Sequence, residues 1–140
     1  MILDTQETFS AAQNAFSAGT DVVSTNVYDT GAAADVGAGE PFFIYAKVNT
    51  AFSGGTSIQV VLQDSADNSS FADVQSAKAI PVASASANAE LCRMRIPVGL
   101  RRYLRLAYRS VGTTTAGSVS AYIVKDVQAQ QYAPSGFTVQ

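Results

Sequence analysis

The alternation of apolar and polar residues constrains the fold of this chain more than any other feature. From residue 20 onward, apolar residues recur at every second position in short runs, and Gly, Ser, Asn or Asp separates the runs. This alternation places the apolar residues on one face of an extended strand, whereas a helix would need a period of about 3.6 residues. The sequence therefore predicts an all-β protein.

Seven or eight short strands are expected, at intervals of about ten residues. The expected strands cover residues 22–28, 41–50, 57–64, 71–80, 90–98, 102–109 and 118–127. Nothing long enough for a helical crossover separates them, so we expect antiparallel pairing in a β-sandwich. The apolar residues expected to face the core include Ile44, Ala46 and Val48, then Ile58, Val60 and Leu62, then Cys92 and Met94, and finally Leu104, Leu106 and Tyr108.

The ends of the chain lack this alternation. We divide the 140 residues into an N-terminal arm (1–20), a β-sandwich domain (21–127) and a C-terminal arm (128–140). The first twenty residues allow two interpretations, a short helix that begins at a capping box of Asp4 and Glu7, or an extended arm. Free tails rarely keep exposed aromatic residues, so the aromatics of both arms are predicted to contact a partner. They are Phe9, Phe16, Tyr132 and Phe137.

Charge is distributed unevenly along the chain. Residues 1–90 carry ten acidic residues and two lysines, net −8, whereas residues 91–140 carry six arginines and one lysine against Asp126, net +6. A surface polarised in this way would steer and orient protein partners. We therefore predict that all six arginines bind a partner: Arg93, Arg95, Arg101, Arg102, Arg105 and Arg109.

Several arrangements could accommodate the arginines. If strands 90–98 and 102–109 form a hairpin, Arg95 lies near Arg105, and carboxylates must face both because like charges across a ladder repel. Those carboxylates could belong to this chain or to a neighbouring subunit. Nucleic acid is not expected as a partner, because the isoelectric point is about 4.8. If the strands belong to opposite sheets, the arginines are divided between two surfaces.

Several function classes lose support. The chain has no histidine, which is the commonest general base and zinc ligand, so we expect neither an enzyme nor a cofactor. Asp64, Asp67 and Asn68 could bind calcium, but their spacing does not fit an EF-hand and such residues favour turns, so no metal is expected.

Cys92 is the only cysteine and lies on an apolar face, which predicts a buried thiol and no internal disulfide. The apolar runs are too short to cross a bilayer, so no membrane contact is expected.

A series of short motifs runs in order along nearly the whole chain. The motifs are Asp4-Thr5-Gln6, Phe9-Ser10-x-Ala12-Gln13, Ser24-Thr25-Asn26-Val27-Tyr28-Asp29-x-Gly31, Gly37-x-Gly39-Glu40-Pro41, Leu62-Gln63-x-Ser65, Pro97-x-Gly99, Arg102-Tyr103-Leu104-Arg105-Leu106-x-Tyr108 and Thr115-Ala116-Gly117-x-Val119. This set resembles the capsid cement, or decoration, proteins of tailed phages of the Bordetella-phage type.

The resemblance implies an antiparallel β-sandwich that is jelly-roll-like, to which the sequence adds extended N- and C-terminal arms. It also implies a structural virion protein, made in the host cytoplasm, that binds the outer capsid surface and cements adjacent subunits of the major capsid protein. Copies of the chain are expected to associate, first as a homodimer and second as a trimer. The resemblance implies no catalytic residue.

The alternative function is a β-sandwich module that binds glycans, such as a virion adhesin. Such a module would need an aromatic side chain that stacks on a sugar, and Tyr28, Tyr45 and Tyr132 are the candidates. An enzyme is the least favoured alternative, because no pair of acid and base residues with plausible spacing can be named.

Overall fold

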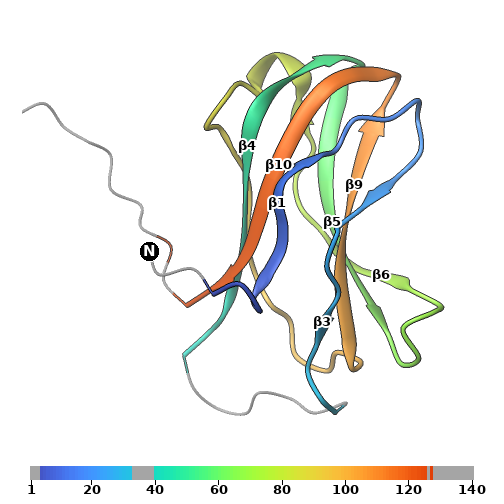
Figure 1. Ribbon diagram of the computed structural model, residues 1–140, viewed down its shortest axis with the longest axis vertical. Coiled ribbons are helices and arrows are strands. Elements are labelled where there is room, and N and C mark those ends of the chain that lie inside the picture. Colours follow the sequence, from blue (N-terminus) through green and yellow to red (C-terminus); the bar gives the residue numbers. More distant parts are fainter. Residues whose placement is uncertain (1–3, 33–39, 126, 128–140) are drawn as a thin grey trace, which may run out of the picture.

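The computed structural model of the chain describes residues 4–32, 40–125 and 127 (Figure 1). Its elements are β1 (Thr8–Asn14), β2 (Val22–Val23), β3 (Tyr28–Asp29), β4 (Phe43–Gly54), β5 (Ser57–Ser65), β6 (Ala72–Ser76), β7 (Ile80–Pro81), the short 3-10 helix η1 (Val82–Ser84), β8 (Glu90–Arg95), β9 (Tyr103–Val111) and β10 (Thr114–Val124). The predicted all-β fold is confirmed. No helix within these residues is long and apolar enough to span a membrane.

Two antiparallel sheets face each other in this fold (Figure 1). The first sheet has the strand order β1-β10-β4-β8. The second has the order β2-β9-β5-β6, with β3 also paired to β9 and β7 also paired to β5. The predicted antiparallel β-sandwich is confirmed.

The strands can be grouped into four passes, each of which joins consecutive strands of one sheet to the other. These passes are β1 to β2 and β3, β4 to β5, β6 and β7 to β8, and β9 to β10. Because β4 pairs with β10 while β5 pairs with β9, neighbouring passes remain neighbours in both sheets. The resulting strand order is that of a jelly roll, in which an antiparallel ribbon wraps around one core.

The core lies between the sheets and consists of the residues that the alternation predicts. Ile44, Ala46 and Val48 of β4 are fully buried, and they face residues such as Leu62 and Leu106 of the second sheet. The central strand β5 is also buried on its outer side, where Val61 and Ser65 have no exposed surface and Gln63 has little. Alternation alone does not reveal this second layer of burial, because it identifies only the inward face of a strand.

The N-terminal segment belongs to the sandwich. Residues 8–14 form β1, which pairs with β10, and Phe9 is buried in the core, so the helix interpretation is wrong for these residues. They are extended, as the other interpretation has it, but they are a strand of the first sheet and not a separate arm. The prediction that Phe9 is an exposed partner contact is wrong for the same reason. Two register shifts interrupt β1, and Ala12 has a φ of 48°. These bulges break the alternation, which explains why the sequence pattern missed the strand.

Polar contacts hold β1 in place. The hydroxyl of Ser10 is hydrogen-bonded to the hydroxyl of Tyr108 across the core at 2.6 Å, and Ala12 donates its N–H to the Ser120 hydroxyl at 2.8 Å. The backbone N–H of Asn26 donates to the carbonyl of Phe9 at 3.0 Å, so the loop after β2 covers the edge of β1. Burial raises the pKa of the Tyr108 hydroxyl. It therefore remains a neutral hydrogen-bonding group.

Two further strand predictions need correction. The expected strand at 22–28 is two short strands, β2 and β3. Just after β2, the Ser24 N–H donates to the Leu106 carbonyl, and the Ser24 hydroxyl accepts a hydrogen bond from the Leu106 N–H. The expected strand at 71–80 is likewise divided into β6 and β7. The C-terminal arm, including Tyr132 and Phe137, lies outside the described residues.

Glycines occupy positions where the backbone has a positive φ and neighbouring atoms lie close. Gly54 and Gly55, at the end of β4, have φ values of 74° and 72°, and a Cβ on Gly54 would lie 2.7 Å from the carbonyl oxygen of Thr113. Gly117 in β10 has a φ of 142°, and a Cβ there would lie 2.3 Å from the ring of buried Phe52. Neither position accepts a side chain without displacing its neighbour.

We predict that Gly117→Ala lowers the free energy of unfolding by about 3 kcal/mol, because a disfavoured backbone conformation and overpacking against Phe52 add together. The matched control is Gly19→Ala, which has a similar backbone requirement (φ 85°) but no neighbour within 4 Å. The Gly19→Ala substitution should lower the free energy of unfolding by only about 1 kcal/mol. Denaturant unfolding measures both values, and equal losses would contradict the packing of Phe52 against Gly117.

Candidate functional site

The six arginines are divided between the two sheets. Arg93 and Arg95 lie on β8 in the first sheet, whereas Arg105 and Arg109 lie on β9 in the second. The hairpin that would place Arg95 beside Arg105 does not form, because β8 pairs with β4 and β9 pairs with β5. The alternative with the strands in opposite sheets is confirmed, and the arginines do not form one cluster.

A polar network covers the outer face of the second sheet. The Arg109 guanidinium donates to Asp21 at 2.7 Å and to Asp73 at 3.1 Å. Gln63 donates to the other oxygen of Asp73 at 2.7 Å and accepts a hydrogen bond from Arg105 at 2.8 Å. The Arg105 guanidinium also lies 3.9 Å from the centroid of the Phe71 ring. This network therefore uses Arg105 and Arg109 within the chain.

The two arginines that precede β9 are also bound internally. Arg101 donates its Nε–H and its backbone N–H to Asp64, each at 2.9 Å, and Arg102 donates to Asp29 at 2.7 and 2.9 Å. Burial raises the pKa of Asp64, but the hydrogen bonds from Arg101 outweigh burial and the pKa falls below its ordinary value. Hydrogen bonds from Arg102 and from the Gly31 N–H lower the pKa of Asp29.

These ion pairs change the interpretation of the charge pattern. Acids from the first ninety residues neutralise arginines from the following twenty, so charges that are separated in the sequence become neighbours in the fold. Carboxylates of the same chain pair with Arg101, Arg102 and Arg109, which is the first of the alternatives considered for the arginines. Arg105 is bound within the chain as well, but to the amide oxygen of Gln63.

The outer face of the first sheet has a different character. Tyr122, Tyr45 and Arg93 are opposite one another on β10, β4 and β8, and the next outward pair, toward the start of β4, is Phe43 with Arg95. The alternate residues Ile44, Met94 and Ile123 point into the core, so these five side chains point outward. We call them the aromatic–arginine face: Phe43, Tyr45, Arg93, Arg95 and Tyr122.

The aromatic–arginine face is accessible and only partly neutralised. Its three aromatic side chains are half-buried and both arginines are exposed. Arg93 pairs with Glu90 at 2.8 Å, whereas no carboxylate of the described residues forms an ion pair with Arg95. Burial, together with nearby Glu90, raises the pKa of Tyr45 despite Arg93, so its hydroxyl stays protonated. Aromatic residues and arginine dominate the centres of protein–protein interfaces.

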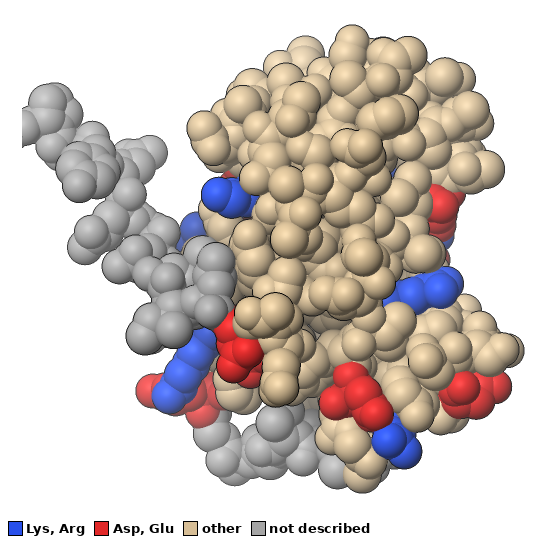
Figure 2. Space-filling model, in the orientation of Figure 1, with Lys and Arg blue, Asp and Glu red and all other residues tan. Residues whose placement is uncertain are grey.

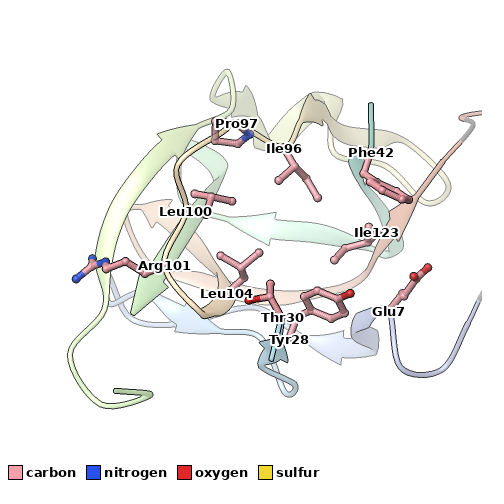
Figure 3. A pocket seen from close by; sticks show the side chains of 10 residues that line it. All are labelled: Glu7, Tyr28, Thr30, Phe42, Ile96, Pro97, Leu100, Arg101, Leu104 and Ile123. Carbon is pink, nitrogen blue, oxygen red and sulfur yellow. The ribbon is translucent and has the colours of Figure 1, made fainter. Parts of the chain in front are cut away.

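A small pocket opens between the two sheets (Figure 3). Its volume is about 270 Å³, and its wall is mainly apolar, with Phe42, Ile96 and Leu104 among the lining residues. Figure 3 shows that the Arg101 side chain extends away from this wall. Its guanidinium is hydrogen-bonded to Asp64. The volume is below the range of roughly 300–1,000 Å³ typical of ligand sites. Tyr28, a candidate for glycan stacking, lines this pocket.

The remaining candidate residues have structural roles. Cys92 is buried, and burial raises the pKa of its thiol to about 12, so the thiol is not a nucleophile. The carboxylate of Asp67 accepts hydrogen bonds from the Ser70 N–H, the Ser65 hydroxyl and the Ser69 N–H, which lower its pKa to about 2. No cluster of three metal-ligating acids or thiols occurs in the described part of the chain.

The paired carboxylates predict acid sensitivity. A carboxyl group whose pKa is lower in the folded state stabilises the fold above the ordinary value of 3.8, and this stabilisation is lost as the pH falls through the folded pKa. We predict that Asp64→Asn lowers the free energy of unfolding by about 2 kcal/mol near neutral pH, since it removes the charge-assisted hydrogen bonds between Asp64 and Arg101. The difference from the unmodified protein should shrink between neutral pH and a pH below the ordinary carboxyl value of 3.8.

Urea unfolding at both pH values measures this effect. The control is Glu40→Gln, because the exposed pair of Glu40 with Lys125 should contribute little. A loss for Asp64→Asn that is as large in acid as near neutral pH would show that the charge of Asp64 is not responsible.

The comparison with known proteins identifies a family. The profile of the family described as Bbp16 matches residues 9–123, which include the strands of both sheets and all six arginines. No curated protein matches the chain significantly. This chain therefore belongs to the Bbp16 family, whose name indicates a protein of a Bordetella phage.

Proposed function

We propose that this protein is a capsid cement protein, which binds the outer surface of a phage head and holds adjacent subunits of the major capsid protein together. The observation that carries the proposal is the aromatic–arginine face, an exposed surface with the residue types of an interface centre on a regular sheet. Membership of the Bbp16 family and the resemblance to phage cement proteins support the same function.

The rigidity of the sheet supports this role. The aromatic–arginine face lies on three adjacent strands, and the core side chains behind it, such as Ile44 and Met94, are buried. A surface that is fixed before binding loses less conformational entropy when it meets its partner. The face is therefore suited to a shell whose subunits repeat in fixed positions.

We propose that the protein acts by binding alone. Burial of apolar surface contributes about 25 cal/mol per Å², and the loss of rotational and translational freedom offsets much of it. One small contact is therefore weak, but a cement protein that touches several neighbours gains effective affinity because the later contacts form within one complex. Separation of the shell subunits must then break several contacts at once.

The proposed partners are the major capsid protein and further copies of this chain. A homodimer is the first expectation and a trimer the second, since either oligomer could contact more than one shell subunit. The proposed location in the virion is the outer capsid surface.

We predict that purified protein, added to heads that lack it, raises the temperature at which those heads are disrupted. The physical reason is that each bound copy adds contacts that must break before shell subunits separate. Light scattering or release of packaged DNA follows disruption, with bovine serum albumin as the control addition. Saturated binding without any rise in this temperature would contradict the cement function.

Glycan binding is the alternative that the same face would permit. Tyr45 and Tyr122 are directly opposite each other in the ladder, and paired rings could stack on a sugar. A glycan array would reveal this activity. Glycan binding together with absence of head binding would favour the adhesin alternative over the cement function.

We further predict that Arg95→Glu weakens binding to heads by about tenfold, because it reverses an exposed charge at the edge of the aromatic–arginine face. The matched control is Lys78→Glu, which reverses an exposed positive charge between β6 and β7, at the edge of the other sheet. Both variants should fold, since neither side chain is buried.

Titration of labelled protein against heads measures these affinities, and circular dichroism confirms the fold. Equal binding by the two variants would show that the aromatic–arginine face does not contact the shell.

A further inference from the structure

The first sheet ends at an open edge, which β8 forms. β8 pairs with β4 on one side, and no other strand of the described residues pairs with it. Ile96, just beyond β8, donates its N–H to the carbonyl of Phe42, and in an antiparallel ladder every second residue is bonded to the same neighbour. Met94 is therefore bonded to β4 as well, whereas Arg93 and Arg95 direct their backbone N–H and C=O groups away from β4.

The other edges of the two sheets are covered or interrupted. The loop after β2 is hydrogen-bonded along β1, where the Asn26 N–H donates to the carbonyl of Phe9 at 3.0 Å and the Asn26 side-chain amide donates to the carbonyl of Thr8 at 2.9 Å. The edges of the second sheet are divided into β2 and β3 and into β6 and β7. β8 has six residues and keeps a regular register from Cys92 to Arg95, so its free side is an available template for a further strand.

The same edge carries positive charge that the described residues do not neutralise. The strands of the first sheet contain four charged residues, namely Lys47, Glu90, Arg93 and Arg95, which are three basic groups against one acid. Glu90 pairs with Arg93, and the ion pairs of the described residues include neither Lys47 nor Arg95. By contrast, Figure 2 shows basic side chains beside acidic ones in the lower part of the molecule. The β8 edge therefore favours an acidic partner.

We propose that an extended, acidic segment of the shell protein adds to the open side of β8 as a further strand. The backbone groups of Arg93 and Arg95 pair with it, which is the usual source of affinity in strand addition. Residues two apart on a strand lie about 7 Å apart on the same face, so carboxylates at alternate positions of the segment each meet one arginine. The residues between them lie on the side of Met94, which is buried, and are apolar.

Charge favours this partner over a second copy of the chain. Two β8 strands paired edge to edge across a two-fold axis would bring Arg93 and Arg95 of one copy against the same arginines of the other. An acidic segment avoids this repulsion and neutralises Arg95. The side chains of Arg93 and Arg95 also belong to the aromatic–arginine face, so one partner can contact the face and the edge together.

This inference deepens the proposed function, on which it rests for the identity of the partner as the shell protein. It adds the kind of segment that the shell protein contributes and the strand to which that segment binds.

Amide hydrogen exchange of the full-length protein, followed residue by residue by NMR, tests the edge directly. In the free protein the amides of Arg93 and Arg95 should exchange quickly, whereas the pairing with β4 should protect the amide of Met94. A saturating synthetic peptide of alternating Glu and Val should slow exchange at Arg93 and Arg95 by at least about tenfold. The control peptide alternates Lys and Val and should leave their exchange unchanged.

Other occupants of the edge would be recognised in the same experiment. Slow exchange at Arg93 and Arg95 without any peptide would overturn the inference, because the edge would already be occupied. An effect that grows with protein concentration would identify a second copy, and an effect independent of concentration would identify a segment of the same chain. Equal effects of the two peptides, or no effect of either, would overturn the inference as well.

Two substitutions at Arg95 separate backbone pairing from charge. Arg95→Gln removes the charge but keeps the N–H, and it should weaken binding of the Glu–Val peptide by about threefold, as for an exposed ion pair. Arg95→Pro also removes the outward N–H, which an edge strand tolerates, and it should weaken binding by at least about tenfold. Equal losses would show recognition by charge alone and would overturn strand addition. Exchange in the unmodified protein decides the question if Arg95→Pro does not fold.

Heads that lack this protein distinguish the inference from the cement function. Protein that binds these heads while the amides of Arg93 and Arg95 still exchange quickly, as measured by mass spectrometry, would overturn the inference and leave the cement function intact. Protection by the Glu–Val peptide without any binding to heads would support the acidic-strand site and contradict the proposed function alone.

Discussion

The antiparallel pairing of the β4 to β5 pass with the β9 to β10 pass is the constraint on which the rest of the structure depends. These two passes occupy the middle of both sheets, so each contributes one central strand to each layer. Their inward residues form much of the core, while their outward residues carry Phe43, Tyr45 and Tyr122 in one layer and Arg105 and Arg109 in the other. One ribbon therefore determines both the fold and the chemistry of its two outer faces.

Separation of charge along the sequence proved a poor guide to separation in space. The acids of the first ninety residues and the arginines that follow are far apart in the sequence, but the fold brings Asp21, Asp64 and Asp73 within hydrogen-bonding distance of arginines. The pairs stabilise the second sheet and neutralise its arginines within the chain. A charge pattern predicts a binding surface only when the strand order is known.

Sequence reasoning recovered the fold class and most of the core, because the alternation in β4, β5, β8 and β9 reports directly which side chains face inward. It missed β1, whose bulges at Ser10 and Ala12 interrupt the alternation. It could not separate the arginines of β8 from those of β9, since the assignment of a strand to a sheet depends on pairings far apart in sequence. The outward aromatics Phe43, Tyr45 and Tyr122 were visible as a pattern, but only the register of β10, β4 and β8 shows that they form one surface.

The central claim is that the outer side of the β1-β10-β4-β8 sheet faces the phage shell. An image reconstruction of purified particles that contain this protein would test the claim most directly. The account predicts density for the jelly roll on the outside of the head, with Phe43, Tyr45, Tyr122 and Arg95 against the major capsid protein. Contact through the outer side of the β2-β9-β5-β6 sheet, or absence of the protein from the head surface, would contradict it.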